Sequence, residues 1–486
     1  MNNDFKNLYP EKLWYYFSEI LNIPRPSKKE DKIVKYLLDF GKKHNLETLQ
    51  DEVGNVLIRK PATPGMENKK PVILQGHIDM VCEKNSDVNH DFDNDPIQAY
   101  VEDGWVKAKG TTLGADDGIG VAAQLAILAS DDIEHGPIEC LFTIDEETGL
   151  TGAFGLKPGF LKGEILLNLD SEDDGELFIG CAGGRDSIIT FDYSKEKTPQ
   201  NHISYRLSVT GLAGGHSGDD INKGKANANK VLNRMLRYSA DNFSMKLSEF
   251  DGGNLRNAIA REAFAIVNVP NENKSSFEKY VTGFEKTVKA EYRITEPDLT
   301  IKLEEVDTPR TIIDGDTQYR LINSLYACPH GVIGMSAEIP GFVETSTNMA
   351  SVKTLDNTIV VTTSQRSSVE SKKDDICNMV ESVFRLAKAK VEQTDGYPGW
   401  TPNPDSEVVE ITKNSYIKLF NETPKVLAIH AGLECGLIGD VYPGMDMISY
   451  GPTIRGAHSP DERLEIKTVE KFWDLTLDVL KNIPEK

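Results

Sequence analysis

The chain has 486 residues, of which 39% are hydrophobic and 27% charged, and this length exceeds what one compact core usually holds. Its 76 acidic residues outnumber its 54 basic residues, so the net charge is −22. Such an acidic protein repels the phosphates of nucleic acids and anionic lipids, which argues against a nucleic-acid or membrane partner. No apolar run approaches the roughly 18 residues of a membrane span. Because the N-terminal segment also has no signal-peptide pattern, we expect a cytoplasmic protein.

Residues 1–186 alternate between helical and extended patterns. The segments with helical apolar spacing are 11–21, 28–43 and 118–130, and the strand-like runs are 56–59, 72–75, 138–143 and 165–169. This alternation is typical of a mostly parallel sheet with helices on both faces. We therefore predict an α/β domain, with a mixed, mostly parallel sheet, in this part of the chain.

The pattern changes from about residue 203, where strand–helix–strand series begin. Helical spacing covers 226–238, 276–290 and 373–390, with alternating strand-like runs between these segments. A Gly- and Pro-rich stretch, DGYPGWTPNPD, then leads back to further helix-like and strand-like runs. We predict an inserted α+β domain at 187–396 and a return of the first domain at 397–486.

Polar side chains follow several predicted strands of the first domain. His77 and Asp79, in the motif GHIDMV, come directly after the strand-like run 72–75. Residues two apart in an extended segment point to the same side, so an aspartate there can orient an imidazole. Asp170 ends another apolar run, and His458 lies in a Gly- and Pro-rich loop near the C-terminus. Taken singly, each is also typical of an ordinary surface loop.

Two further motifs place adjacent carboxylates beside glycines. In TTLGADDGIG, a first-turn helix acid explains Asp117, but it does not explain a second acid, Asp116, in the same glycine-flanked turn. In LFTIDEETG, an apolar run ends in Asp145, Glu146 and Glu147, which repel one another unless they are solvated or bind a cation. Of two adjacent glutamates, one can bind a metal while the other transfers protons. A solvated acidic loop is the alternative.

The carboxyl ends of strands in an open α/β sheet lie at one edge, so these imidazoles and carboxylates are predicted to converge there. Mixed histidine and carboxylate ligands suit two divalent ions, with zinc preferred and manganese or cobalt as alternatives.

These motifs together resemble the co-catalytic zinc peptidase family of aminoacylases, carnosinases and tripeptidases. Within that family, GTTLGADDGIG, HAGLECG and RGAHSPDERL are most similar to the bacterial aminoacyl-histidine dipeptidases. The resemblance runs along essentially the whole chain. It implies a zinc-peptidase catalytic domain, formed by 1–186 and 397–486, with an inserted lid domain.

The resemblance also implies a ligand set for two metal ions per subunit. Asp116 bridges the two metals, and the peptide bond that follows it is cis. His77 and Asp170 complete one site, and Glu147 and His458 complete the other.

Catalytic and substrate-binding roles are implied in the same way. Asp79 orients the metal-binding histidine two residues before it, and Glu146 is the general base. In the lid, His216 of GLAGGHSGDDI matches a histidine that reaches the substrate, while Asn257 and Arg366 match residues near it. The segment around Asn257 reads Asn-Ala-Ile-Ala where the family usually has Asn-x-Ile-Pro.

The predicted activity is hydrolysis of Xaa-His and other unblocked dipeptides by a water molecule that two metals activate. The alternatives on the same site are a broad dipeptidase, a cysteinylglycinase or a tripeptide aminopeptidase. A non-catalytic, metal-containing binding protein is the alternative from another class, although a structural site has no use for the spare carboxylate of Glu146. The sequence leaves open whether His216 acts within its own chain or across a homodimer.

Overall fold

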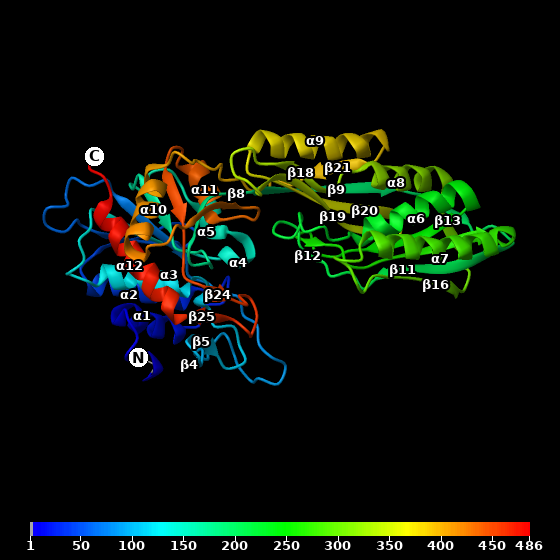
Figure 1. Ribbon diagram of the computed structural model, residues 1–486. Coiled ribbons are helices and arrows are strands. Elements are labelled where there is room, and N and C mark those ends of the chain that lie inside the picture. Colours follow the sequence, from blue (N-terminus) through cyan, green and yellow to red (C-terminus); the bar gives the residue numbers. More distant parts are fainter. Residues whose placement is uncertain (1–2) are drawn as a thin grey trace. The chain divides into compact units, whose positions relative to one another are not determined.

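The computed structural model describes residues 3–486 and divides into two compact units (Figure 1). Unit 1 contains the residues up to Gly180 together with Trp400–Ala428 and Leu433–Lys486. Unit 2 contains Cys181–Gly399 and the short segment Ile429–Gly432. The assignment of these parts to a catalytic domain and a lid domain stays a prediction.

Unit 1 is built on an eight-stranded sheet with the order β1-β2-β6-β3-β7-β23-β8-β22. The strands are β1 Glu47–Gln50, β2 Val56–Lys60, β3 Val72–His77, β6 Ile138–Thr143, β7 Ile165–Asn168, β8 Glu176–Cys181, β22 Lys425–Ile429 and β23 Asp446–Ser449. At its centre β3 runs parallel to β6 and β7, and β23 runs parallel to β7. Every residue of β3, β6 and β7 is buried, which explains their continuous apolar runs. The predicted mixed α/β sheet is confirmed, with parallel pairs at its centre, while β1, β2 and β8 pair with their neighbours in antiparallel fashion.

Helices and one small sheet complete unit 1. The helices are η1 Asn3–Phe5, α1 Glu11–Leu21, α2 Asp31–Lys43, α3 Ala115–Leu128, α4 Glu146–Gly149, α5 Thr151–Gly155, α10 Glu407–Phe420, α11 Glu434–Val441 and α12 Ile466–Asn482. The four-stranded sheet has the order β24-β25-β5-β4, with β4 Ala99–Glu102, β5 Trp105–Ala108, β24 Ile454–Arg455 and β25 Arg463–Glu465. Helix α3 packs against both α1 and β3. It is therefore buried almost all round, which explains its Ala-rich sequence.

Unit 2 is built on a nine-stranded antiparallel sheet with the order β16-β11-β15-β13-β19-β20-β9-β21, in which β18 also pairs with β19. The strands are β9 Gly183–Asp192, β11 His202–Thr210, β13 Lys246–Gly252, β15 Ala263–Pro270, β16 Thr300–Val306, β18 Gly331–Met335, β19 Val343–Thr354, β20 Thr358–Ser367 and β21 Lys390–Gln393. Two short pairs accompany it, β10 Lys195–Lys197 with β17 Thr311–Ile313 and β12 Gly215–His216 with β14 Ala258–Ile259.

Four α-helices pack against this sheet (Figure 1). They are α6 Ala228–Phe243, α7 Lys274–Glu291, α8 Gly315–Ala327 and α9 Glu370–Leu386, and the short η2 Asn271–Asn273 precedes α7. Leu207 and Val361 of the sheet join Leu232, Phe277 and Phe384 of the helices in one buried hydrophobic cluster. This strand-and-helix layering is the predicted α+β architecture.

Two helix predictions in unit 2 need correction. The sequence predicts a helix over 373–390, but α9 ends at Leu386 because Lys388 adopts a φ of 57° and the chain then enters β21. Helix α8 was not predicted, although Asp314 caps its N-terminus by accepting a hydrogen bond from the Thr317 N–H at 2.8 Å.

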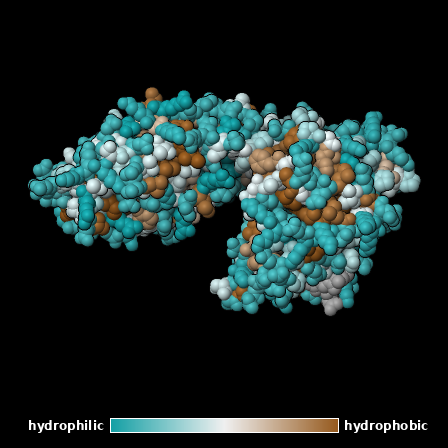
Figure 2. All heavy atoms as spheres, turned by 180° about the vertical axis from the view of Figure 1, so that it is seen from behind, coloured by the Kyte–Doolittle hydropathy of each residue, from teal (hydrophilic) through white to brown (hydrophobic). Residues whose placement is uncertain are grey.

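Hydrophilic side chains cover most of the face seen in Figure 2, as expected for a chain with 27% charged residues. Within the described residues, no helix has the length and apolar character needed to cross a bilayer. All six cysteines are free thiols.

Candidate metal centre

The first ligand group forms where two parallel strands end. His77 ends β3, Asp170 lies just beyond β7, and Asp116 lies in the first turn of α3. The Nε2 atom of His77 is 3.0 Å from Oδ1 of Asp116 and 3.4 Å from Oδ1 of Asp170. The parallel pairing of β3 with β7 brings the His77 and Asp170 ends to one edge of the sheet, as the sequence predicts.

The second ligand group shares Asp116 with the first. The Nε2 atom of His458 is 3.1 Å from Oδ2 of Asp116 and 3.0 Å from Oε2 of Glu147. Each oxygen of Asp116 therefore faces one histidine. In each of the two groups, the donor atoms lie within 4.8 Å of one another. The peptide bond between Asp116 and Asp117 is cis, as the resemblance implies.

The carboxylates of the two ligand groups favour positive charge beside them, as the pKa values of the two histidines show. Hydrogen bonds to Asp116 and Glu147 raise the pKa of His458 to about 11. Burial alone would lower the pKa of His77, but the carboxylates of Asp170 and Asp116 raise it well above its usual value. Burial raises the pKa of Asp170 to about 7. These buried carboxylates thus attract cations strongly.

The donor set also fits a pair of divalent ions chemically. It offers two imidazoles and three carboxylates, the ligand types that zinc takes in proteins. The Oε1 atom of Glu147 is buried and has no hydrogen-bond partner in the described part of the chain, so a metal is a suitable partner for it.

Asp79 contacts His77 and the turn that carries Glu146 and Glu147. Its Oδ1 atom lies 3.3 Å from Nδ1 of His77 and accepts a hydrogen bond from the Glu146 N–H at 3.0 Å. Its Oδ2 atom accepts hydrogen bonds from the Ser27 hydroxyl at 2.7 Å and the Glu147 N–H at 3.3 Å. One buried carboxylate therefore faces the ring of a candidate ligand, His77, and also holds the turn that carries both glutamates.

Glu146 lies beside the ligands without belonging to either shared group. Donor atoms of Glu146, His77 and Glu147 lie within 4.8 Å of one another. Burial raises the pKa of Glu146 well above its usual value. A carboxylate with a raised pKa next to these candidate metal ligands is suited to take up and return a proton.

Sequence patterns did not reveal how Arg25 and Glu434 contribute here. The buried guanidinium of Arg25 donates hydrogen bonds to the carbonyl oxygens of Ile78, at 3.0 Å, and Asp79, at 2.6 Å. The Oε2 atom of Glu434 accepts hydrogen bonds from Nε2 of Gln75 at 2.6 Å and from Thr143. Burial raises the pKa of Glu434 to about 7.

The three predicted substrate residues all belong to unit 2. His216 lies in β12, and its Nδ1 atom is 3.3 Å from Oδ2 of Asp219. Arg366 of β20 is buried and donates a hydrogen bond to the Tyr397 hydroxyl at 2.9 Å, while its Nε has no partner among the described residues. His216 lowers the pKa of Asp219 and Arg366 adds to this shift, so the three lie in one neighbourhood. Asn257 is exposed in the loop before β14.

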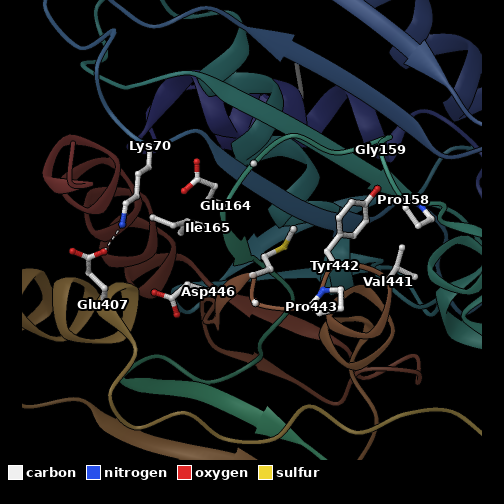
Figure 3. A pocket seen from close by; sticks show the side chains of 13 residues that line it. Lys70, Pro158, Gly159, Glu164, Ile165, Glu407, Val441, Tyr442, Pro443 and Asp446 are labelled. Atoms are coloured by element: carbon white, nitrogen blue, oxygen red, sulfur yellow. Dashed lines mark hydrogen bonds and ion pairs between the residues drawn. The ribbon is translucent and has the colours of Figure 1, made fainter. Parts of the chain in front are cut away.

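A separate hollow of about 490 Å³ lies in unit 1, and Figure 3 shows the residues that line it. Ile165 and Asp446 among them are the first residues of β7 and β23, so the hollow lies at the opposite end of β7 from Asp170. Lys70 forms an ion pair with Glu407 at 2.7 Å, and Asp446 accepts a hydrogen bond from the Val408 N–H at 2.9 Å. The residues that line it include no histidine. Lys70, Glu407 and Asp446 thus already have partners within the protein, and the convergent imidazoles and carboxylates are the better candidate site.

Comparisons with known proteins give concordant matches along the chain. Residues 73–482 match the model of peptidase family M20/M25/M40. The sequence is 44% identical, over 484 residues and the full length of both chains, to the cytosol non-specific dipeptidase of Escherichia coli. The structure matches the aminoacylhistidine dipeptidase from Vibrio alginolyticus with a TM-score of 0.92 and 48% identity, covering 100% of this chain and 99% of that one. The aminopeptidase PepT from Bacillus cereus shares the fold, with a TM-score of 0.58, 16% identity and coverage of 98% and 99%.

Proposed function

The chain belongs to peptidase family M20/M25/M40, and from this we infer that it is a metal-dependent dipeptidase that hydrolyses unblocked dipeptides, Xaa-His dipeptides among them. The observation that carries the proposal is the pair of ligand groups that share Asp116. Two full-length relatives named as dipeptidases support the substrate class, and the name of the Escherichia coli relative supports a cytoplasmic location.

Five residues would hold the two ions. His77, Asp116 and Asp170 would bind one, and Asp116, Glu147 and His458 would bind the other. When bound, two such cations lower the pKa of a water molecule and polarise a substrate carbonyl. We propose zinc because imidazole and carboxylate ligands suit it, with manganese and cobalt as alternatives.

The chain's own residues handle the protons. A carboxylate oxygen of Glu146 accepts a proton from the attacking water as the new C–O bond forms at the peptide carbonyl. Glu146 then returns that proton to the amine nitrogen as the C–N bond breaks, which restores its carboxylate. Asp79 orients the His77 ring, because its Oδ1 atom lies 3.3 Å from Nδ1.

Unit 2 supplies the proposed substrate contacts through His216, Asn257 and Arg366. Arg366 combines a buried guanidinium with an Nε that has no hydrogen-bond partner among residues 3–486. A planar guanidinium pairs well with a carboxylate, and every unblocked dipeptide carries one at its C-terminus. This supports Arg366 as a residue that recognises dipeptides.

The test is peptide turnover combined with metal analysis. The purified protein is assayed with β-alanyl-histidine and other Xaa-His dipeptides, further dipeptides including Cys-Gly, tripeptides and N-acyl amino acids, before and after chelation. We expect dipeptide hydrolysis that chelation abolishes and added zinc restores. Preference for tripeptides or N-acyl amino acids would contradict the dipeptide assignment, and no turnover at full metal loading would favour a binding protein.

The variant Glu146→Gln tests the proton-transfer step. Its amide cannot accept the proton, so we expect kcat to fall by about 10²–10⁴-fold while two metal ions stay bound. Turnover near the wild-type value would remove Glu146 from this role.

A further inference from the structure

The carboxylate of Glu462 holds the backbone of the turn that ends in Asp116. Its Oε2 atom accepts hydrogen bonds from the N–H groups of Leu113, at 2.7 Å, and Gly114, at 2.9 Å. Its Oε1 atom accepts hydrogen bonds from the N–H groups of Ala115, at 2.7 Å, and Asp116, at 3.4 Å. Glu462 is only 2% exposed. Four successive N–H groups thus converge on one buried anion.

The same loop also supplies a metal-binding histidine. His458 precedes Glu462 by four residues, and its Nε2 atom lies 3.1 Å from Oδ2 of Asp116. The antiparallel strands β24 and β25 anchor this loop at both ends. This loop therefore contacts Asp116 at two points. His458 lies beside its side chain, and Glu462 accepts a hydrogen bond from its backbone N–H.

Arg25 binds a carbonyl oxygen of the same turn, whereas Glu462 binds its N–H groups. Its guanidinium donates a hydrogen bond to the carbonyl oxygen of Gly114, while Glu462 accepts one from the Gly114 N–H. Gly114 has a φ of 69°, and a Cβ there would lie 2.6 Å from Nη2 of Arg25. The turn before Asp116 therefore has little freedom to rotate.

We propose that Glu462 is a positioning residue of the metal centre, which fixes the backbone of Asp116 so that this carboxylate presents one oxygen to each ligand group. This inference rests on the proposed metal-binding function of Asp116. It requires a carboxylate, because each oxygen accepts two N–H groups and an amide NH₂ in place of either oxygen cannot accept any.

The test measures metal binding directly in Glu462→Gln. Partners that orient metal ligands typically change metal affinity by about 10–100-fold when they are mutated. We expect a loss of this size for the weaker-bound ion, measured by competition with a chromophoric chelator, and a changed visible spectrum of the cobalt-substituted protein. We also expect a lower kcat at saturating metal, with KM within about twofold of the wild type.

Asp461→Asn is the matched control, because it removes an exposed charge from the same loop without touching the four N–H groups. If Glu462→Gln matches Asp461→Asn in metal affinity and cobalt spectrum, the proposal is wrong, even if thermal stability falls. Should Glu462→Gln fail to fold, Glu462→Asp carries the test, because its shorter side chain cannot span all four N–H groups. Wild-type affinity and spectrum in that variant would overturn the proposal.

The metal affinity and the cobalt spectrum are measured without peptide hydrolysis, so they are independent of the dipeptidase assignment. A wild-type protein that binds two ions but cleaves no dipeptide would refute the dipeptidase assignment and leave the role of Glu462 standing.

Discussion

Asp79→Asn is the sharpest test of how the metal centre is supported. The carboxylate of Asp79 faces four donors, which are His77 Nδ1, the N–H groups of Glu146 and Glu147, and the Ser27 hydroxyl. An asparagine amide can turn so that its NH₂ faces Ser27, whose hydroxyl can accept instead of donate. The Glu147 N–H then loses its acceptor, and an unpaired buried donor costs about 1–3 kcal/mol.

Each 1.4 kcal/mol corresponds to a factor of ten, so this cost predicts a loss of about 5- to 150-fold in whatever the turn positions. We expect kcat and metal affinity of Asp79→Asn to fall within that range, because the turn carries both Glu146 and Glu147. Ser27→Ala is the matched control. It removes one neutral hydrogen bond, about 0.5–1.5 kcal/mol, and leaves both backbone donors paired, so its loss should be about tenfold or less.

The assay combines steady-state kinetics at saturating zinc with chelator competition on both variants. Asp79→Asn with kcat and metal affinity within twofold of the wild type would refute the reasoning, since it would mean that the glutamate turn holds its position without this carboxylate.

Two further predictions concern packing and pH. A Cβ at Gly76 would lie 2.0 Å from Oδ2 of Asp117. Gly76→Ala should therefore lower the free energy of unfolding by about 1–3 kcal/mol through overpacking, and it should weaken metal binding. Gly315→Ala is the control, because a Cβ there meets open space, and its free energy of unfolding in chemical denaturation should stay within about 0.5 kcal/mol of the wild type. Burial lowers the pKa of His330 to about 4 from 6.5. Between about pH 6.5 and pH 4 the His330 imidazole is therefore protonated in the unfolded chain but neutral in the folded protein. The free energy of unfolding is for this reason unaffected by His330 above pH 6.5, and it falls by up to about 3 kcal/mol as the pH drops to 4. Denaturation midpoints of His330→Gln should fall less steeply over this window, and identical slopes would contradict the prediction.

The central sheet of unit 1 could be predicted because its strands are buried on both faces. Such strands appear as unbroken apolar runs, and parallel pairing then brings their carboxyl ends to one edge. His77 and Asp170 follow neighbouring runs of this kind, so their 3.4 Å approach was implied by the pattern. Local signals were less complete in unit 2. Helix α8 begins at Gly315 directly after its cap, Asp314, and its short polar start obscured the helical spacing that follows.

The contacts of Glu462 and Arg25 had no comparable signal, because their partners are backbone groups. Glu462 binds N–H groups and Arg25 binds carbonyl oxygens, and almost every residue carries both, so no residue type at 113–115 marks the partnership. Glu462 is also 346 positions from Asp116, so only the folded chain brings the two together. Metal ligands differ, because their chemistry restricts them to a few residue types and makes them visible in a sequence. The backbone groups that Glu462 and Arg25 bind are common to almost every residue, and for this reason the sequence indicated the candidate metal ligands but not these two supporting contacts.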